Sequence, residues 1–167
     1  MTTLKYLAGY SPAVREQVQM LIGNNKLSEL LINKYPVAHQ IRNDKALYLY
    51  VMGIKAQYLR KSAPLSKIVF DDKINVLHHA LGLHTFVSRV QGGNLKAKNE
   101  IRVASVFKNM PIEFLNMIVV HELAHLREKQ HNKAFYKLCA HMEPDYQQLE
   151  FDTRLYLTHI DLLGVLY

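Results

Sequence analysis

Three histidines and a glutamate stand close together in the segment IVVHELAHLREKQH, residues 118–131. His121 and His125 are four residues apart, which is about one helical turn, so on a helix both rings project from the same side. Two neutral imidazoles in that arrangement can hold one zinc ion. Glu122 follows the first histidine, and His131 lies six residues beyond the second. The spacing predicts a zinc site whose ligands are His121, His125 and His131.

The spacing also predicts catalytic chemistry. A catalytic zinc ion needs three protein ligands and an open fourth position. Zinc lowers the pKa of a bound water towards about 7, and a neighbouring glutamate can take the proton of that water. Glu122 is the expected general base. His131 reaches the metal only if the chain turns back after the helix, and His141 is a rival third ligand. The other histidines are scattered and are expected to be structural or exposed.

Composition alone does not account for this motif. The chain has 9 histidines in 167 residues, and chance then gives roughly 0.02 occurrences of H-E-x-x-H. The motif also falls among apolar residues, with Ile118, Val119 and Leu123 beside it. These residues make the predicted helix apolar on two faces, so it is expected to lie between two layers, with its histidines aimed inward or into a cleft.

Capping residues and helix breakers predict the elements that position the motif. The predicted helices cover residues 12–23, 27–35, 45–61, Asp71 or Asp72 to Gly82, 111–129, 133–142 and 145–163. Residues 84–107 instead alternate between β-branched and polar types around the turn-rich stretch GGNLKAKN, which predicts a β-hairpin. The expected architecture is α+β, with a small antiparallel sheet or hairpin packed on the H-E-x-x-H helix. Residues 1–66 are expected to form a helical N-terminal extension and residues 67–167 the zincin-like catalytic domain, as one compact unit.

The charge of the chain is strongly positive, at +7. The segment 89–108 holds five cations against one acid, and its cations are Arg89, Lys96, Lys98, Arg102 and Lys108. A basic face can attract nucleic acid or an anionic substrate, although no basic recognition helix, zinc finger or RNA-binding signature accompanies it. The single cysteine, Cys139, excludes an internal disulfide and is expected in the core. With no secretory signal and no membrane-spanning run, we expect a cytoplasmic protein without a membrane partner.

The stretch VVHELAHLREKQHNKAFYKLCAHMEPDY resembles the YgjP-like metallopeptidases, which are relatives of the SprT and WLM zincins. The likeness covers residues 84–146. It implies a zincin-like fold, a zinc cofactor, His121, His125 and His131 as ligands, and Glu122 as general base. Many members carry an Arg-Trp-Gly-Ser-Cys type segment before the motif. Arg89 matches that arginine as an implied substrate contact, although the four residues that follow it in the family pattern are missing here.

Four functions remain open at this stage. A zinc metallopeptidase acting on peptides or unfolded protein is the leading expectation. A zinc hydrolase of a small anionic substrate such as a nucleotide is the alternative, and an SprT-like peptidase recruited to nucleic acid is the third. A non-enzymatic metal-binding module is disfavoured because a structural zinc site does not need a general base such as Glu122.

Overall fold

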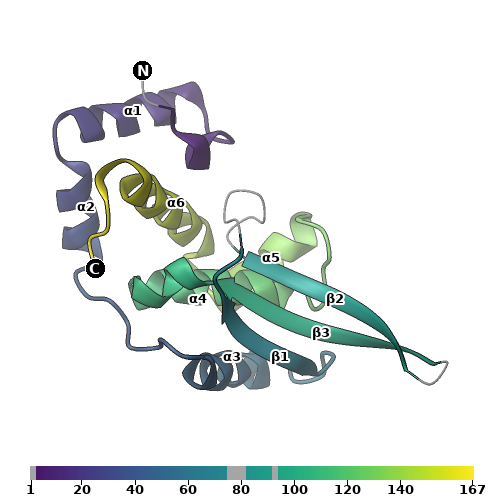
Figure 1. Ribbon diagram of the computed structural model, residues 1–167. Coiled ribbons are helices and arrows are strands. Elements are labelled where there is room, and N and C mark those ends of the chain that lie inside the picture. The colour runs from purple at the N-terminus through teal and green to yellow at the C-terminus, as the bar shows by residue number, and fades with distance from the viewer. Residues whose placement is uncertain (1–2, 75–81, 92–93) are drawn as a thin grey trace.

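The computed structural model describes residues 3–74, 82–91 and 94–167, and for 82–91 and 94–98 it describes the backbone only. The described chain is an α+β fold in which helices surround one small sheet (Figure 1). The α-helices are α1 (Pro12–Gly23), α2 (Leu27–Lys34), α3 (Asp44–Tyr58), α4 (Ile112–Ala124), α5 (Lys133–Met142) and α6 (Tyr146–Leu163). The strands and 3-10 helices are β1 (Leu65–Asp71), β2 (Gly82–Gln91), β3 (Asn94–Ala104), η1 (Lys5–Leu7) and η2 (Ser105–Asn109). In these described ranges, no helix combines the length and apolar character needed to cross a bilayer.

Side-chain caps explain why three of the helices begin where the sequence predicts. Ser11, Asn43 and Asn132 each accept a hydrogen bond from the backbone N–H three residues further on, at the starts of α1, α3 and α5. Each bond satisfies a donor that the first helical turn leaves without a partner. The predicted starts of these three helices are therefore confirmed.

The sheet has the strand order β1-β3-β2 and is mixed. Strands β2 and β3 pair antiparallel, as the predicted hairpin requires, whereas β1 runs parallel to β3. The sequence prediction missed β1, so the expectation of a wholly antiparallel sheet is wrong. Ile68 of β1 faces Ile101 of β3 in the register, and both are buried. Burial of these apolar side chains on the same face explains why β1 joins the hairpin.

Two predicted elements near the hairpin can be compared with the observed strand boundaries. Strand β3 ends at Ala104 and is followed by η2, so the predicted hairpin end at residue 107 is too late. The helix predicted from Asp71 or Asp72 to Gly82 lies mostly outside the described residues. Of its two ends, Asp71 belongs to β1 and Gly82 to β2.

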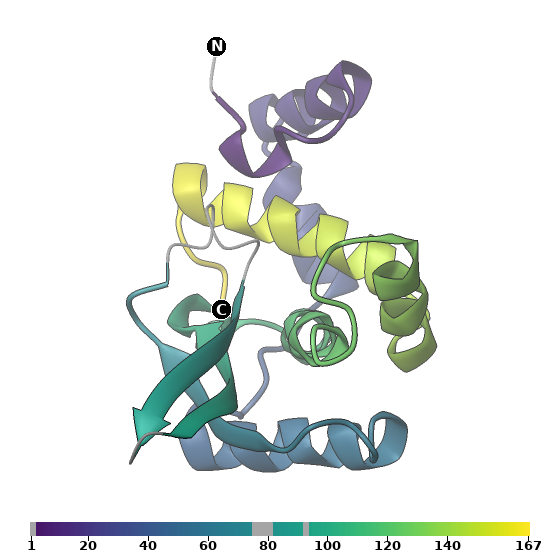
Figure 2. The same cartoon turned by 90° about the vertical axis from the view of Figure 1, so that its right-hand side faces the viewer.

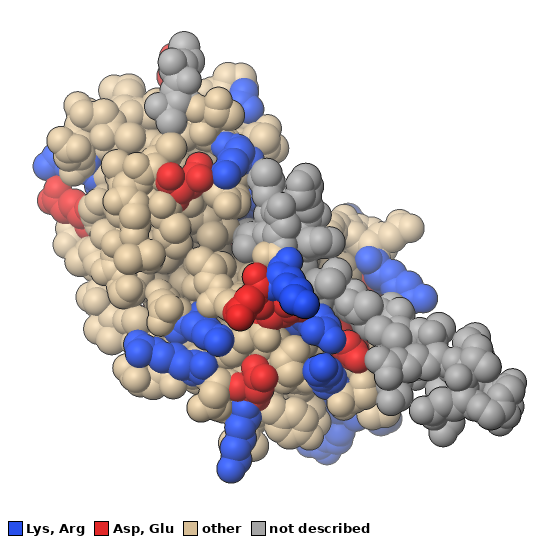
Figure 3. Space-filling view, viewed as in Figure 1, with Lys and Arg blue, Asp and Glu red and all other residues tan. Residues whose placement is uncertain are grey.

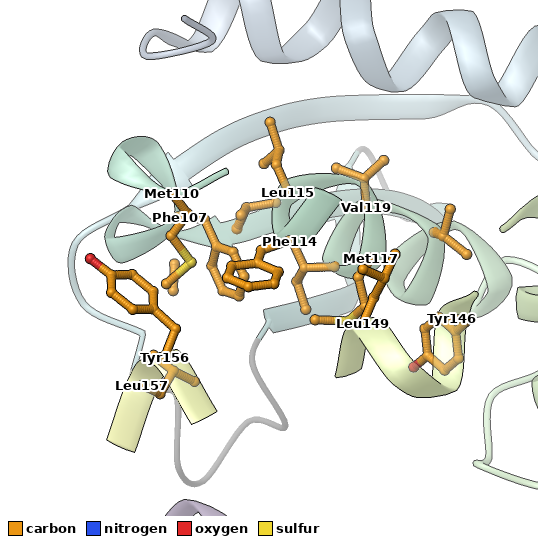
Figure 4. Close-up of a cluster of buried hydrophobic side chains, with 14 of the residues drawn as sticks. Phe107, Met110, Phe114, Leu115, Met117, Val119, Tyr146, Leu149, Tyr156 and Leu157 are labelled. Carbon is orange, nitrogen blue, oxygen red and sulfur yellow. The ribbon is translucent and has the colours of Figure 1, made fainter. Parts of the chain in front are cut away.

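Helix α4 runs through the middle of the molecule. Figure 2 shows it nearly end-on, with α6 above, α3 below, the sheet on one side and α5 on the other. Its apolar residues pack against α6 and the end of the sheet, where Phe107, Phe114 and Tyr156 are fully buried (Figure 4). The prediction that this helix lies between two layers is confirmed.

The N-terminal elements pack against α6 (Figure 1). Asp152 of α6 is 2% exposed and accepts hydrogen bonds from Lys34, Tyr35 and Gln148. Burial and the Asp152 carboxylate raise the pKa of Tyr35, which keeps its hydroxyl protonated as a donor. These bonds tie the end of α2 to α6. The division of the chain at residue 66 stays a prediction.

Candidate metal centre

The H-E-x-x-H motif lies at the C-terminal end of α4, inside the protein. His121 is 7% exposed and Glu122 is 1% exposed, and the apolar residues around them are fully buried. Burying an imidazole and a carboxyl group costs free energy unless each finds a partner. We therefore expect the buried His121 and Glu122 to belong to a functional site at this end of α4.

The three histidines of the motif segment meet at one point. The Nε2 atom of His125 lies 3.3 Å from Nε2 of His121 and 3.1 Å from Nε2 of His131. One nitrogen from each ring falls in a cluster whose atoms all lie within 4.8 Å of one another. In the described part of the chain, this is the cluster of histidine, cysteine and acidic groups that could hold a metal ion.

An early helix end brings His131 back to the other two rings. Helix α4 ends at Ala124, and not near Lys129 as the sequence predicts. His125 occupies the C-cap position, and the next two backbone N–H groups bond to carbonyls three residues earlier. Such tighter turns commonly end an α-helix. The chain can then loop around before Asn132 caps α5, so that His131 faces the end of α4.

Hydrogen bonds fix the orientation of the two α4 histidines. Nδ1 of His125 lies 2.9 Å from the carbonyl oxygen of Glu128, and Nδ1 of His121 lies 2.7 Å from the hydroxyl oxygen of Tyr146. When Nδ1 carries the proton and donates it in these bonds, Nε2 is left with its lone pair. A metal ligand needs a nitrogen in that state.

The aromatic ring of Phe135 supports all three histidines. It is fully buried on α5, and its centroid lies 4.9, 4.6 and 4.9 Å from the rings of His121, His125 and His131. Close packing of this kind restricts the rotamers that each imidazole can adopt. One side chain therefore holds the three rings in a converging arrangement.

The electrostatics of the site favour neutral imidazoles. Burial lowers the pKa of His121 well below its ordinary value, and the neighbouring histidines lower it further. Burial also lowers the pKa of His125, against the raising effect of its bond to the Glu128 carbonyl. Because a metal ion binds only the unprotonated ring, these shifts leave both histidines ready to act as ligands near neutral pH.

Glu122 is a buried carboxyl group whose Oε2 atom has no hydrogen-bond partner among the described residues. Burial alone raises the pKa of Glu122 well above its ordinary value. An unsatisfied buried oxygen of this kind usually has a functional reason or an additional partner. A water molecule held at the histidine cluster would be such a partner.

The geometry of the histidines fits a zinc ion. Ligand nitrogens about 2.0–2.1 Å from a tetrahedral zinc lie about 3.3–3.4 Å from one another. The distances from Nε2 of His125 to Nε2 of His131 and His121, 3.1 and 3.3 Å, are close to that spacing. Three neutral imidazoles leave a fourth position for water, and the orphaned oxygen of Glu122 can serve that water.

The structure places the other predicted residues away from this cluster or leaves them undescribed. The ring of His141 packs edge-on against Tyr58 and does not join the histidine cluster. The guanidinium of Arg102 is bonded to Asp71 and Glu100. The side chain of Arg89 is not among the described ones, so its predicted substrate contact stays a prediction.

The sequence does not predict the hydrogen bond between His121 and Tyr146. The two residues are 25 positions apart and lie on different helices. No short motif links them, so only the packing of α6 against α4 shows the contact.

Two comparisons relate the chain to known proteins. Residues 73–154 match the family described as YgjP-like, metallopeptidase domain. The chain is also 59% identical over 162 residues to the UTP pyrophosphatase of Escherichia coli (strain K12), and the alignment covers 97% of each protein. No solved structure matches the chain.

Proposed function

The chain belongs to the YgjP-like metallopeptidase family, and from that premise we propose that it is a zinc-dependent hydrolase of nucleoside triphosphates, with UTP as its substrate. This proposal rests mainly on the 59% identity to a UTP pyrophosphatase along nearly the whole length of both chains. This similarity favours the anionic-substrate reading over the peptidase reading, which the sequence alone places first. The proposed fold is correspondingly zincin-like, with the mixed sheet beside the histidine helix.

The proposed reaction converts UTP and water into UMP and pyrophosphate. The oxygen of water forms a bond to the α-phosphorus, and the bond from that phosphorus to the α–β bridging oxygen breaks. The bridging oxygen leaves with pyrophosphate. One proton leaves the attacking water during this step and must be accepted by a base.

Each residue of the site has a separate proposed role in this reaction. His121, His125 and His131 would hold the zinc ion. Zinc, when bound, supplies the Lewis acidity that makes water a stronger nucleophile near neutral pH. Glu122 would accept the proton of that water through its orphaned oxygen, and its raised pKa helps it to retain the proton. The buried surroundings of Glu122 keep bulk water from competing for the same oxygen.

Exposed cations beside the third histidine support an anionic substrate. Residues 125–137 hold four exposed cations, and the one acid of the segment, Glu128, is bonded to Asn132. These cations are Arg127, Lys129, Lys133 and Lys137. Positive charge on the loop that carries His131 and on the following helix α5 raises the local concentration of a polyphosphate. A neutral peptide would gain little from it.

The test is a substrate panel with zinc-loaded protein. UTP, CTP, ATP and GTP are incubated separately with wild-type protein and with Glu122→Gln, and UMP and pyrophosphate are measured by chromatography. We expect UTP to be turned over faster than the other three and the variant to be inactive. Absence of nucleotide turnover in the wild type would overturn the proposal.

A peptidase remains the second candidate, because the matching family is described as a metallopeptidase domain. Unfolded protein is therefore included in the same panel. Cleavage of unfolded protein that Glu122→Gln abolishes, together with intact UTP, would establish the peptidase instead. The proposed recruitment to nucleic acid would then be tested by salt-dependent DNA binding.

A further inference from the structure

Tyr146 is the point at which α6 touches the metal centre. It is the first residue of α6, its side chain is fully buried, and it lies at the end of the core cluster toward which α4 runs (Figure 4). Its hydroxyl oxygen lies 2.7 Å from Nδ1 of His121, and the two rings stack with their centroids 6.3 Å apart. Both bonding partners are therefore shielded from bulk water.

The direction of this hydrogen bond follows from the position of the other ring nitrogen. Nε2 of His121 points at Nε2 of His125, 3.3 Å away, on the side where the three histidines meet. A nitrogen that binds metal carries no proton, so the proton of the neutral ring is on Nδ1. Nδ1–H then donates to the oxygen of Tyr146, and the hydroxyl proton of Tyr146 remains available for another acceptor.

Glu150 lies one turn further along α6 than Tyr146. Burial raises the pKa of the Tyr146 phenol most, and the nearby charge of Glu150 raises it further. Arg154 follows after another turn, with its Nε 3.5 Å from a carboxylate oxygen of Glu150. Residues four apart on a helix share one face, so all three side chains line the same side of α6.

Arg154 connects this face of α6 to the N-terminal part of the chain. Its Nη1 donates to the carbonyl oxygen of Tyr6, next to the 3-10 helix η1, at 3.1 Å. The side chains of Arg154 and Glu150 are only 22% and 19% exposed, so the pair is sheltered from screening. This bond ties the face of α6 that carries Tyr146 to the N-terminal segment.

We propose that Tyr146 is the positioning residue of the metal centre, which holds His121 in the tautomer and ring orientation that bind metal. This inference rests on the proposed zinc centre, but it concerns metal binding and not the substrate. Partners of metal-bound histidines typically change metal affinity about 10–100-fold when they are removed.

The experiment compares Tyr146→Phe with Tyr50→Phe in the full-length protein, with zinc and cobalt(II) as the probes. The matched control is apt because the Tyr50 hydroxyl also bonds to α4, through Asn116 at 2.7 Å, without touching a histidine. Zinc affinity, measured by competition with a chelator, should fall about 10–100-fold in Tyr146→Phe and stay within about twofold in Tyr50→Phe. The visible spectrum of the cobalt(II) protein should change only in Tyr146→Phe.

Two results would overturn the inference. Wild-type zinc affinity and an unchanged cobalt spectrum in Tyr146→Phe would remove the positioning role. Equal losses in both variants would show that any hydroxyl bond to α4 matters for helix stability alone. If Tyr146→Phe does not fold, nitrogen NMR of the His121 ring in the zinc-loaded wild type replaces it, and a proton on Nε2 instead of Nδ1 would overturn the positioning role. Failure of UTP hydrolysis in the wild type would leave these binding results standing.

Discussion

The Nε2 atoms of His125 and His131 lie 3.1 Å apart, although the end of α4 and a loop separate the two residues. A hydrogen bond at this distance needs a proton on one of the two nitrogens, whereas two unprotonated nitrogens repel each other through their lone pairs. A shared cation removes this repulsion, which is why converging imidazoles indicate a metal ion. The loop from His125 to Asn132 keeps the rings close because the Glu128 carbonyl bonds to His125 at one end and the Asn132 side chain caps α5 at the other.

The first prediction concerns the third ligand. Purified protein should hold about one zinc ion per chain, and His131→Ala should weaken zinc binding sharply because two protein ligands close the site poorly. The matched control is His141→Ala, since the His141 ring packs on Tyr58 and not on the cluster. Metal content after dialysis and chelator competition measure both variants. Full zinc content in His131→Ala with loss in His141→Ala would contradict the assignment.

The second prediction concerns Glu122. Glu122→Gln should keep the zinc ion, because the glutamate is not a ligand, and should lower the rate of hydrolysis by about 10²–10⁴-fold. Glutamine has nearly the same shape, so the buried space remains filled. Zinc content, circular dichroism and the rate of UMP release are measured on the same preparation. A variant with normal zinc content and normal turnover would exclude Glu122 as the base.

Local signals account for what could be predicted from the sequence. The caps at Ser11, Asn43 and Asn132 act within one helical turn, so their helices begin where they were expected. The H-E-x-x-H motif is equally local, because His121 and His125 face the same way on any helix. The prediction of a buried helix that brings two histidines together therefore needed no tertiary information.

Contacts between distant residues explain what was missed. Strand β1 is short, and its pairing with β3 joins residues more than 30 positions apart, such as Ile68 and Ile101. The contact between Tyr146 and His121 is also non-local. The end of α4 at Ala124 was missed because residues 126–129 are acceptable in a helix, and the need to return His131 to the cluster overrides that preference.

The third prediction concerns pH and His39, which lies outside the metal centre. Its Nε2–H donates to the carbonyl oxygen of Phe107 at 2.7 Å, and its Nδ1 accepts from the N–H of Ile41 at 2.9 Å. Protonation of Nδ1 would break the second bond. Burial accordingly lowers the pKa of His39 below its ordinary value of 6.5, with a smaller lowering effect from Arg42. The folded protein therefore prefers the neutral ring.

The sign of the pH effect follows from proton binding. As the pH falls below 6.5, the unfolded chain takes up this proton before the folded protein does, so the free energy of unfolding decreases until the folded pKa is reached. The slope from one such group is at most about 1.4 kcal/mol per pH unit. In metal-free protein, His39→Gln should lose less stability than wild type on acidification in urea unfolding, whereas His141→Gln should behave like wild type. Identical pH profiles for His39→Gln and wild type would refute the assignment.

The last prediction concerns the basic segment 89–108, where Arg102 is one of the five cations that could attract nucleic acid or an anionic substrate. Its guanidinium instead lies 3.1 Å from Asp71 and 3.2 Å from Glu100. Figure 3 shows positive and negative side chains interspersed over the described part of this face, and not a broad positive surface. Glu100 is 6% exposed, so its carboxylate depends on Arg102 for compensation. Arg102 therefore has a structural role that competes with substrate binding.

Arg102→Met should lower the free energy of unfolding by about 1–3 kcal/mol, because it leaves the buried Glu100 carboxylate without its charged partner. The KM for UTP should stay unchanged, since the guanidinium is already held by two acids. Lys67→Met is the matched control, because Lys67 is exposed on β1 opposite Glu100 and its loss should leave the stability nearly unaffected. Urea unfolding and steady-state kinetics are measured on both variants. A large rise in KM for Arg102→Met with unchanged stability would show that Arg102 leaves its acids to bind the triphosphate.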